Sequence, residues 1–102
     1  MKGNGTSTAR RQQQHAARLA WLRARPELLA QLPSATEDVD PAQSAALDRT
    51  VKDLKQVRLL APTAAPVNAR WWIRLWVSEL RGEPVSPKEQ RWALRGSSEA
   101  DL

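Results

Sequence analysis

The stretch from Val67 to Gly82, VNARWWIRLWVSELRG, constrains the fold of this chain more than any other. It holds three of the five tryptophans, in a sequence that has no phenylalanine and no tyrosine. If the stretch is a helix, one of its faces carries four large apolar residues: Trp72, Ile73, Trp76 and Leu80. Because such a helix is apolar over most of its circumference, we expect it to be buried on more than one side, in its own domain or against a partner.

A second apolar side of the same helix carries Trp71 and Leu75, about 100° from the first. Tryptophan, arginine and leucine are common in contacts between proteins, and this side exceeds the need of one small core. We therefore interpret Trp71 and Leu75 as interface residues, with self-association as the simplest form. A polar stripe separates the two sides and consists of Arg70, Arg74 and Arg81.

Proline and glycine divide the rest of the chain into helix-forming stretches, and no stretch shows the alternation of a strand. The sequence therefore predicts an all-α, single-domain bundle of four to five helices. The expected helices span residues 9–25, 26–32, 41–60 and 68–81, followed by one that carries Trp92 and ends at Gly96. The domain covers 9–96; a basic segment, 1–8, and an acidic tail, 97–102, are predicted to be disordered.

The helix expected at 41–60 is amphipathic and turns one apolar face toward the core. Asp40 followed by Pro41 is typical of a helix start, since aspartate caps the first turn and proline fits the first position. The predicted core combines this face with the tryptophan helix and the last helix: Leu47, Val51, Leu54, Trp72, Ile73, Trp76, Leu80 and Trp92.

Charge is distributed in blocks along a chain whose formal net charge is +5. Residues 1–25 hold six basic groups and no acid, whereas 26–48 hold five acids and no base. In the helix expected at 9–25, a basic side with Leu22 among its members lies opposite an alanine side predicted to pack. Basic stripes at helical spacing favour contact with a polyanion. The candidate phosphate-contacting residues are Arg11, Arg18, Arg23, Arg25, Arg70, Arg74 and Arg81.

Catalytic constellations are hard to assemble from this sequence, so we expect no enzymatic activity, no metal and no cofactor. His15 is the only histidine, there is no cysteine, and the four glycines form no phosphate-binding loop. The acids at 37–40 resemble a solvated linker more than a magnesium site.

The first hypothesis is a small basic protein that associates with nucleic acid as a regulatory or packaging factor. We expect it to form an oligomer and to be encoded by a bacterium, a phage or a plasmid. The alternative is a protein–protein adaptor, inhibitor or oligomeric structural component with no nucleic-acid role. The N-terminus has no apolar signal segment, and the sequence has no apolar run long enough to span a membrane. We therefore expect a cytoplasmic protein that contacts no membrane. The same features are compatible with a component of a virion. No small-molecule substrate is expected.

Overall fold

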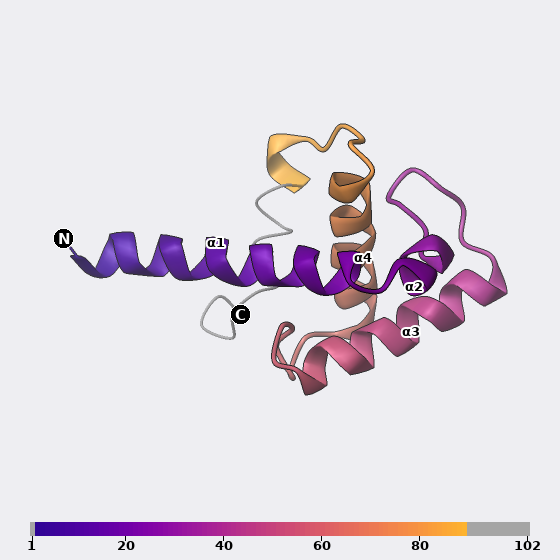
Figure 1. Cartoon of the computed structure of the whole chain (residues 1–102), viewed down its shortest axis with the longest axis horizontal. Helices are drawn as coiled ribbons and strands as arrows, with labels where there is room; N and C mark the ends of the chain where they lie inside the picture. Colours follow the sequence, from indigo (N-terminus) through magenta and orange to yellow (C-terminus); the bar gives the residue numbers. More distant parts are fainter. Residues whose placement is uncertain (1, 90–102) are drawn as a thin grey trace.

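The computed structural model describes the backbone of residues 2–89 and the side chains of residues 9–89, and the described backbone is helical without strands. This confirms the all-α fold class. The helices are α1 (Lys2–Arg23), α2 (Pro26–Gln31), α3 (Pro41–Gln56) and α4 (Pro66–Leu80), and a further helical turn begins at residue 87. Figure 1 shows α4 standing across the directions of α1 and α3, with the short α2 near their crossing.

Proline starts three of these helices, since Pro26, Pro41 and Pro66 each occupy the first helical turn. At α3 the predicted cap is present: the Asp40 carboxylate accepts a hydrogen bond from Gln43 N at 2.7 Å. The Gln43 side chain completes a capping box by accepting from Asp40 N at 3.0 Å.

Helix α4 begins at Pro66, two residues before the expected start at residue 68, because a proline at the first position sets the helical backbone. Ala65 is the N-cap residue, and its side chain has no group that could accept a capping hydrogen bond. Val67 therefore lies inside the first turn with 67% of its surface exposed.

Helices α3 and α4 end in the same backbone motif. After α4, Gly82 adopts a φ of 73°, and Glu83 N donates to Ser78 O at 2.9 Å, as predicted for a glycine after the last turn. After α3, Arg58 takes this role with a φ of 62°, and Leu59 N donates to Leu54 O at 2.9 Å. The helix thus ends at Gln56, short of the expected residue 60, because Arg58 reverses the chain without a glycine to announce it.

Helix α1 begins at Lys2, so the predicted start at Ala9 is wrong. Residues such as glycine and threonine are weak helix formers, but extending an existing helix adds a hydrogen bond for each residue fixed. The first half of α1 extends away from the other helices (Figure 1).

The core gathers around α4, which is buried on several sides within its own domain. Of the predicted core residues, Leu47, Val51, Leu54, Trp72, Ile73 and Trp76 are buried, and Leu80 is half-buried against them. Trp92 lies outside the described residues, as do Gly96 and the tail 97–102. The last described turn opens with the expected capping box, in which Glu89 N donates to Ser86 Oγ at 3.2 Å.

Candidate nucleic-acid interface

The two sides of α1 are reversed relative to the prediction. The predicted basic side is the side that packs: Leu22 and Arg18 are fully buried, and His15 is half-buried. The alanines predicted to pack, Ala16 and Ala20 among them, are exposed. The apolar residues Leu19, Trp21 and Leu22 decide the orientation, because burying them yields more free energy than burying alanine.

Arg18 is therefore wrong as a phosphate-contacting residue. Its guanidinium lies over the Trp76 ring, 4.3 Å from the centroid, and none of its surface is exposed. Burial lowers the pKa of Arg18 to about 9, while the nearby carboxylate of Glu79 opposes this by favouring the charged form. The arginine contributes to packing and attracts an acid of α4, and it offers no charge to a ligand.

His15 joins the same contact between α1 and α4. Its Nε2 lies 2.9 and 3.0 Å from the two carboxylate oxygens of Glu79. The imidazole also meets Trp76 edge-on, with ring centroids 6.2 Å apart. His15 thus fixes α1 on the core.

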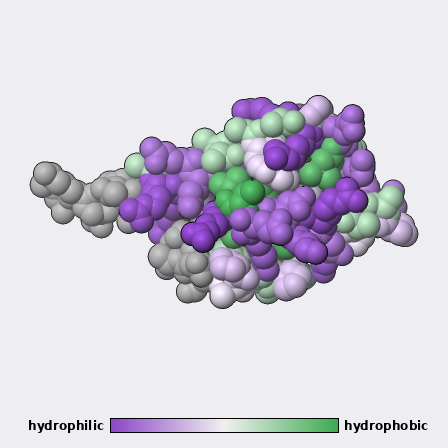
Figure 2. All heavy atoms as spheres, turned by 60° about the horizontal axis from the view of Figure 1, so that its bottom comes forward, coloured by the Kyte–Doolittle hydropathy of each residue, from purple (hydrophilic) through white to green (hydrophobic). Residues whose placement is uncertain are grey.

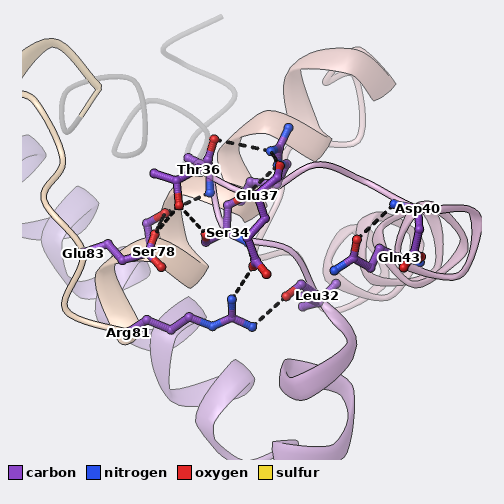
Figure 3. Close-up of polar contacts among 11 residues, drawn as sticks. Leu32, Ser34, Thr36, Glu37, Asp40, Gln43, Ser78, Arg81 and Glu83 are labelled. Atoms are coloured by element: carbon purple, nitrogen blue, oxygen red, sulfur yellow. Dashed lines mark hydrogen bonds and ion pairs between the residues drawn. The ribbon is translucent and has the colours of Figure 1, made fainter.

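Two arginines of the α4 stripe are held by the connector between α2 and α3. Arg74 donates through Nε to Ser34 O at 3.0 Å and through Nη2 to the carbonyls of Ala35 and Glu37. Arg81 donates to Leu32 O at 2.9 Å and pairs with the Glu37 carboxylate (Figure 3). These guanidiniums satisfy carbonyls that no helix pairs, so Arg74 and Arg81 are structural.

Glu37 completes this connector. The backbone N–H of Ser34, which donates to Oε1 at 2.7 Å, and then Arg81 hold the pKa of the Glu37 carboxyl below its ordinary value. Ser78 of α4 adds a further tie by accepting from Ala35 N at 2.9 Å (Figure 3 labels Ser78 beside the connector).

The third member of the stripe, Arg70, pairs with Asp48 of α3 at 2.6 Å. Its side chain remains 36% exposed, so it lies at the surface with part of its charge answered by the acid. Each arginine of the predicted α4 stripe thus has a hydrogen-bonded or ion-paired partner within the protein. The acidic block that precedes these arginines in the chain is a sequence signal that could have indicated this pairing.

The remaining candidates, Arg11, Arg23 and Arg25, are exposed. Arg25 lies flat on the Trp21 indole, 3.8 Å from the centroid, and donates to Trp21 O at 2.9 Å. Arg10, which the sequence reading passed over, is exposed as well. Arg11, Arg23 and Arg25 thus lie exposed on α1 or just after its end, and the exposed parts of Arg70 and Arg81 belong to side chains that already have partners in the protein.

The two predicted interface residues, Trp71 and Leu75, differ in burial. Leu75 has no exposed surface and belongs to the core, so its assignment as an interface residue is wrong. The reason is that α4 is enclosed by its own domain on both apolar sides. Trp71 is half-buried against the core, with Arg74 5.3 Å from its ring centroid.

Within the described part of the chain, no group of three or more histidines or acids lies close enough to hold a metal ion. None of the helices described is both long and apolar enough to cross a membrane. Compared with known proteins, the chain matches no family model, no curated protein and no solved structure.

Proposed function

We propose that this protein binds nucleic acid along its phosphate backbone, with the exposed part of α1 as the contact surface, and acts as a regulatory or packaging factor. The observation that carries the proposal is the shape and charge of α1. Its first half extends from the body of the protein, and residues 1–25 contain six basic groups and no acid. Where α1 leaves the body of the protein, Figure 2 shows mainly hydrophilic side chains on the coloured part of the helix.

Within the described residues, this part of α1 contributes no side chain to the core. Residues 9–13 are all exposed, whereas a helix that serves a core buries one face. A polyanion gives it a role, because each arginine that meets a phosphate releases condensed counterions. The exposed alanines Ala16 and Ala20 add no bulk, so a backbone can approach while Arg10 and Arg23 reach it from either side.

Helix α4 is not part of the proposed contact surface, because its arginines already have partners. Arg74 and Arg81 donate to backbone carbonyls, and Arg70 already has Asp48. Moving the guanidiniums of Arg74 and Arg81 to phosphates would take donors away from part-buried carbonyls of the connector, which is costly. The proposal therefore concerns contacts made by α1 and by Arg25, and it includes no catalytic step.

The test is binding of a mixed-sequence duplex and of a single strand at several salt concentrations, followed by fluorescence anisotropy. We compare wild type with a double variant, Arg10→Gln and Arg23→Gln, in which glutamine preserves helix propensity. Because each duplex phosphate contact contributes a salt slope of about −0.9, the double variant should reduce the slope by up to about two.

The matched control is a second double variant, Lys52→Gln and Lys88→Gln, which removes the same charge from exposed positions outside α1. It should keep the slope of the wild type. Equal losses in both double variants would mean that net charge alone is responsible. If the wild type binds neither nucleic acid at low salt, the proposal fails, and the adaptor hypothesis takes its place.

A further inference from the structure

A hollow of about 440 Å³ opens where the end of α1 turns into α2 and meets α3. Two arginines line it: Arg25, between α1 and α2, and Arg49 of α3. Most of the remaining lining comes from α2, which packs against both α1 and α3. The three helices thus bring two guanidiniums, far apart in the sequence, to the same hollow.

The guanidinium of Arg25 is held in place before any ligand arrives. It lies 3.8 Å from the centroid of the Trp21 ring and donates through Nη1 to Trp21 O at 2.9 Å. A guanidinium has five N–H donors, so most of them remain after this hydrogen bond. Because the side chain is already ordered, binding an anion costs it little conformational entropy.

Arg49 differs from the arginines of α4 because it has no partner among the described residues. Its side chain is exposed and makes no hydrogen bond and no ion pair within residues 9–89. The neighbouring Asp48 pairs with Arg70, and Asp53, one turn further along α3, forms no ion pair with Arg49. The charge of Arg49 can therefore meet a ligand in the hollow without breaking a contact described in the protein.

One acid, Glu27 in the first turn of α2, also lines the hollow and is exposed. The lining keeps an excess of positive charge, with two guanidiniums against one carboxylate. The planar N–H groups of a guanidinium match the oxygens of a phosphate, which accept two parallel hydrogen bonds. The hollow thus favours a phosphate, and the repulsion from Glu27 limits how tightly that phosphate is held.

We infer that this hollow binds a phosphate of the nucleic acid that α1 contacts, with Arg25 and Arg49 as the donors. The inference rests on the proposed function and extends it. Arg25 already belongs to the proposed contact surface, and Arg49 continues that surface across α2 to α3. The phosphate backbone therefore runs past the end of α1, onto an arginine outside the candidate set named from the sequence.

Binding of a mixed-sequence duplex at several salt concentrations tests the role of Arg49. Arg49→Gln should reduce the salt slope by about 0.9, the value of one duplex phosphate contact. Between about 50 and 200 mM salt, the wild type should then lose about 3.5-fold more affinity than the variant. Arg49→Lys should keep the slope, because it keeps the charge, but should bind more weakly because it loses the planar fork.

The control for Arg49→Gln is Lys88→Gln, which removes an exposed charge outside the hollow. It should keep the slope of the wild type. Circular dichroism should give the same helix content for all these variants, since glutamine and lysine are good helix formers. Equal reductions of the slope in Arg49→Gln and Lys88→Gln would overturn the inference.

A change of opposite sign tests whether the phosphate lies in the hollow itself. Glu27→Gln removes the acid of the lining and should strengthen duplex binding about two- to fivefold at low salt. Asp38→Asn removes an exposed acid outside the hollow and should strengthen binding less. Equal gains in the two variants would mean that net charge alone is responsible, and would place the phosphate elsewhere.

Inorganic phosphate, added at constant ionic strength without nucleic acid, tests the other source of this ligand. A rise in melting temperature that Arg49→Gln abolishes, together with an unchanged salt slope in that variant, would assign the hollow to free phosphate and overturn the inference.

Failure of the inference and failure of the proposed function give different results. If the α1 double variant reduces the slope and Arg49→Gln does not, α1 contacts the nucleic acid and the hollow takes no part. If the wild type binds no nucleic acid at low salt, both proposals are overturned. A reduced slope in Arg49→Gln, a kept slope in Lys88→Gln and a gain confined to Glu27→Gln together support the assignment of the hollow.

Discussion

Helices α1 and α4 both carry arginines at helical spacing, but the two helices use them differently. Those associated with α4 donate to the connector at residues 32–37 or pair with Asp48. On α1, Arg18 packs on Trp76, while Arg10, Arg11 and Arg23 are exposed. The difference comes from what each helix faces. Helix α4 meets a connector whose carbonyls are not bonded within a helix and accept from its arginines. The first half of α1 extends beyond the neighbouring helices.

The comparison shows that spacing alone does not make a stripe of arginines a binding surface. A guanidinium carries five N–H donors, and it binds carbonyls within the protein as readily as phosphates outside it. The irregular segment nearest to an arginine therefore decides its role as much as the helix that carries it.

The largest effect is expected for Trp76→Ala. Trp76 is fully buried and supports both Arg18 and His15 of α1, so the change removes a core side chain and the contact between the two helices. The free energy of unfolding should fall by about 3–5 kcal/mol. Urea denaturation followed by circular dichroism measures it. Trp71→Ala is the control, with a smaller loss because Trp71 is half-buried; equal losses would contradict the difference in burial.

The next effect concerns the connector. Arg74→Gln removes a guanidinium that donates to three backbone carbonyls, so we expect a loss of about 2–3 kcal/mol in the free energy of unfolding. Arg10→Gln, an exposed change on α1, should alter it by less than about 0.5 kcal/mol. The same denaturation experiment compares them. Two equal values would remove the distinction drawn between the arginines of the two helices.

Arg18→Met tests the buried arginine of α1 with a smaller expected effect. Methionine is shorter than arginine and loses the guanidinium contact with Trp76, but it fills part of the same buried space with apolar atoms that need no hydrogen-bond partner. The free energy of unfolding should change by less than about 1.5 kcal/mol. The salt slope for duplex binding should equal that of the wild type, and a shallower slope would return Arg18 to the contact surface.

The smallest effect is a dependence of stability on pH through Glu37. Folding lowers the pKa of this carboxyl, so its stabilising contribution is present at neutral pH and is lost as the pH falls through the lowered pKa. In Glu37→Gln the acid-induced loss of stability should be smaller. Urea midpoints measured from neutral to acidic pH provide the comparison, and parallel curves for the two proteins would show that Glu37 contributes nothing.

Much of the fold could be predicted because proline and glycine mark helix boundaries by their backbone geometry. Pro26 and Pro41 start helices as expected, and Gly82 follows the end of α4. The end of α3 could not be predicted in this way, because Arg58 adopts a left-handed conformation that favours glycine. No glycine stands at this position to indicate the turn.

The candidate site was less predictable than the fold. The exposure of Arg23 and Arg25 agrees with the sequence reading, but the burial of Arg18 depends on Trp76, which lies far along the chain. The orientation of α1 was predictable in principle, since Leu22 lay on the side interpreted as basic. Alanine misled that interpretation, because it is compatible with both packing and exposure.

The attachment of α1 at His15 has a mechanical consequence. With a rise of about 1.5 Å per residue, the part of the helix before His15 forms a lever arm about 20 Å long. A pivot of about 10° at the attachment would carry the tip through about 3 Å, close to the axial spacing of about 3.4 Å between phosphates along one strand of a duplex. The tip can thus follow the curvature of a polyanion while Trp76 and the core beneath it stay in place.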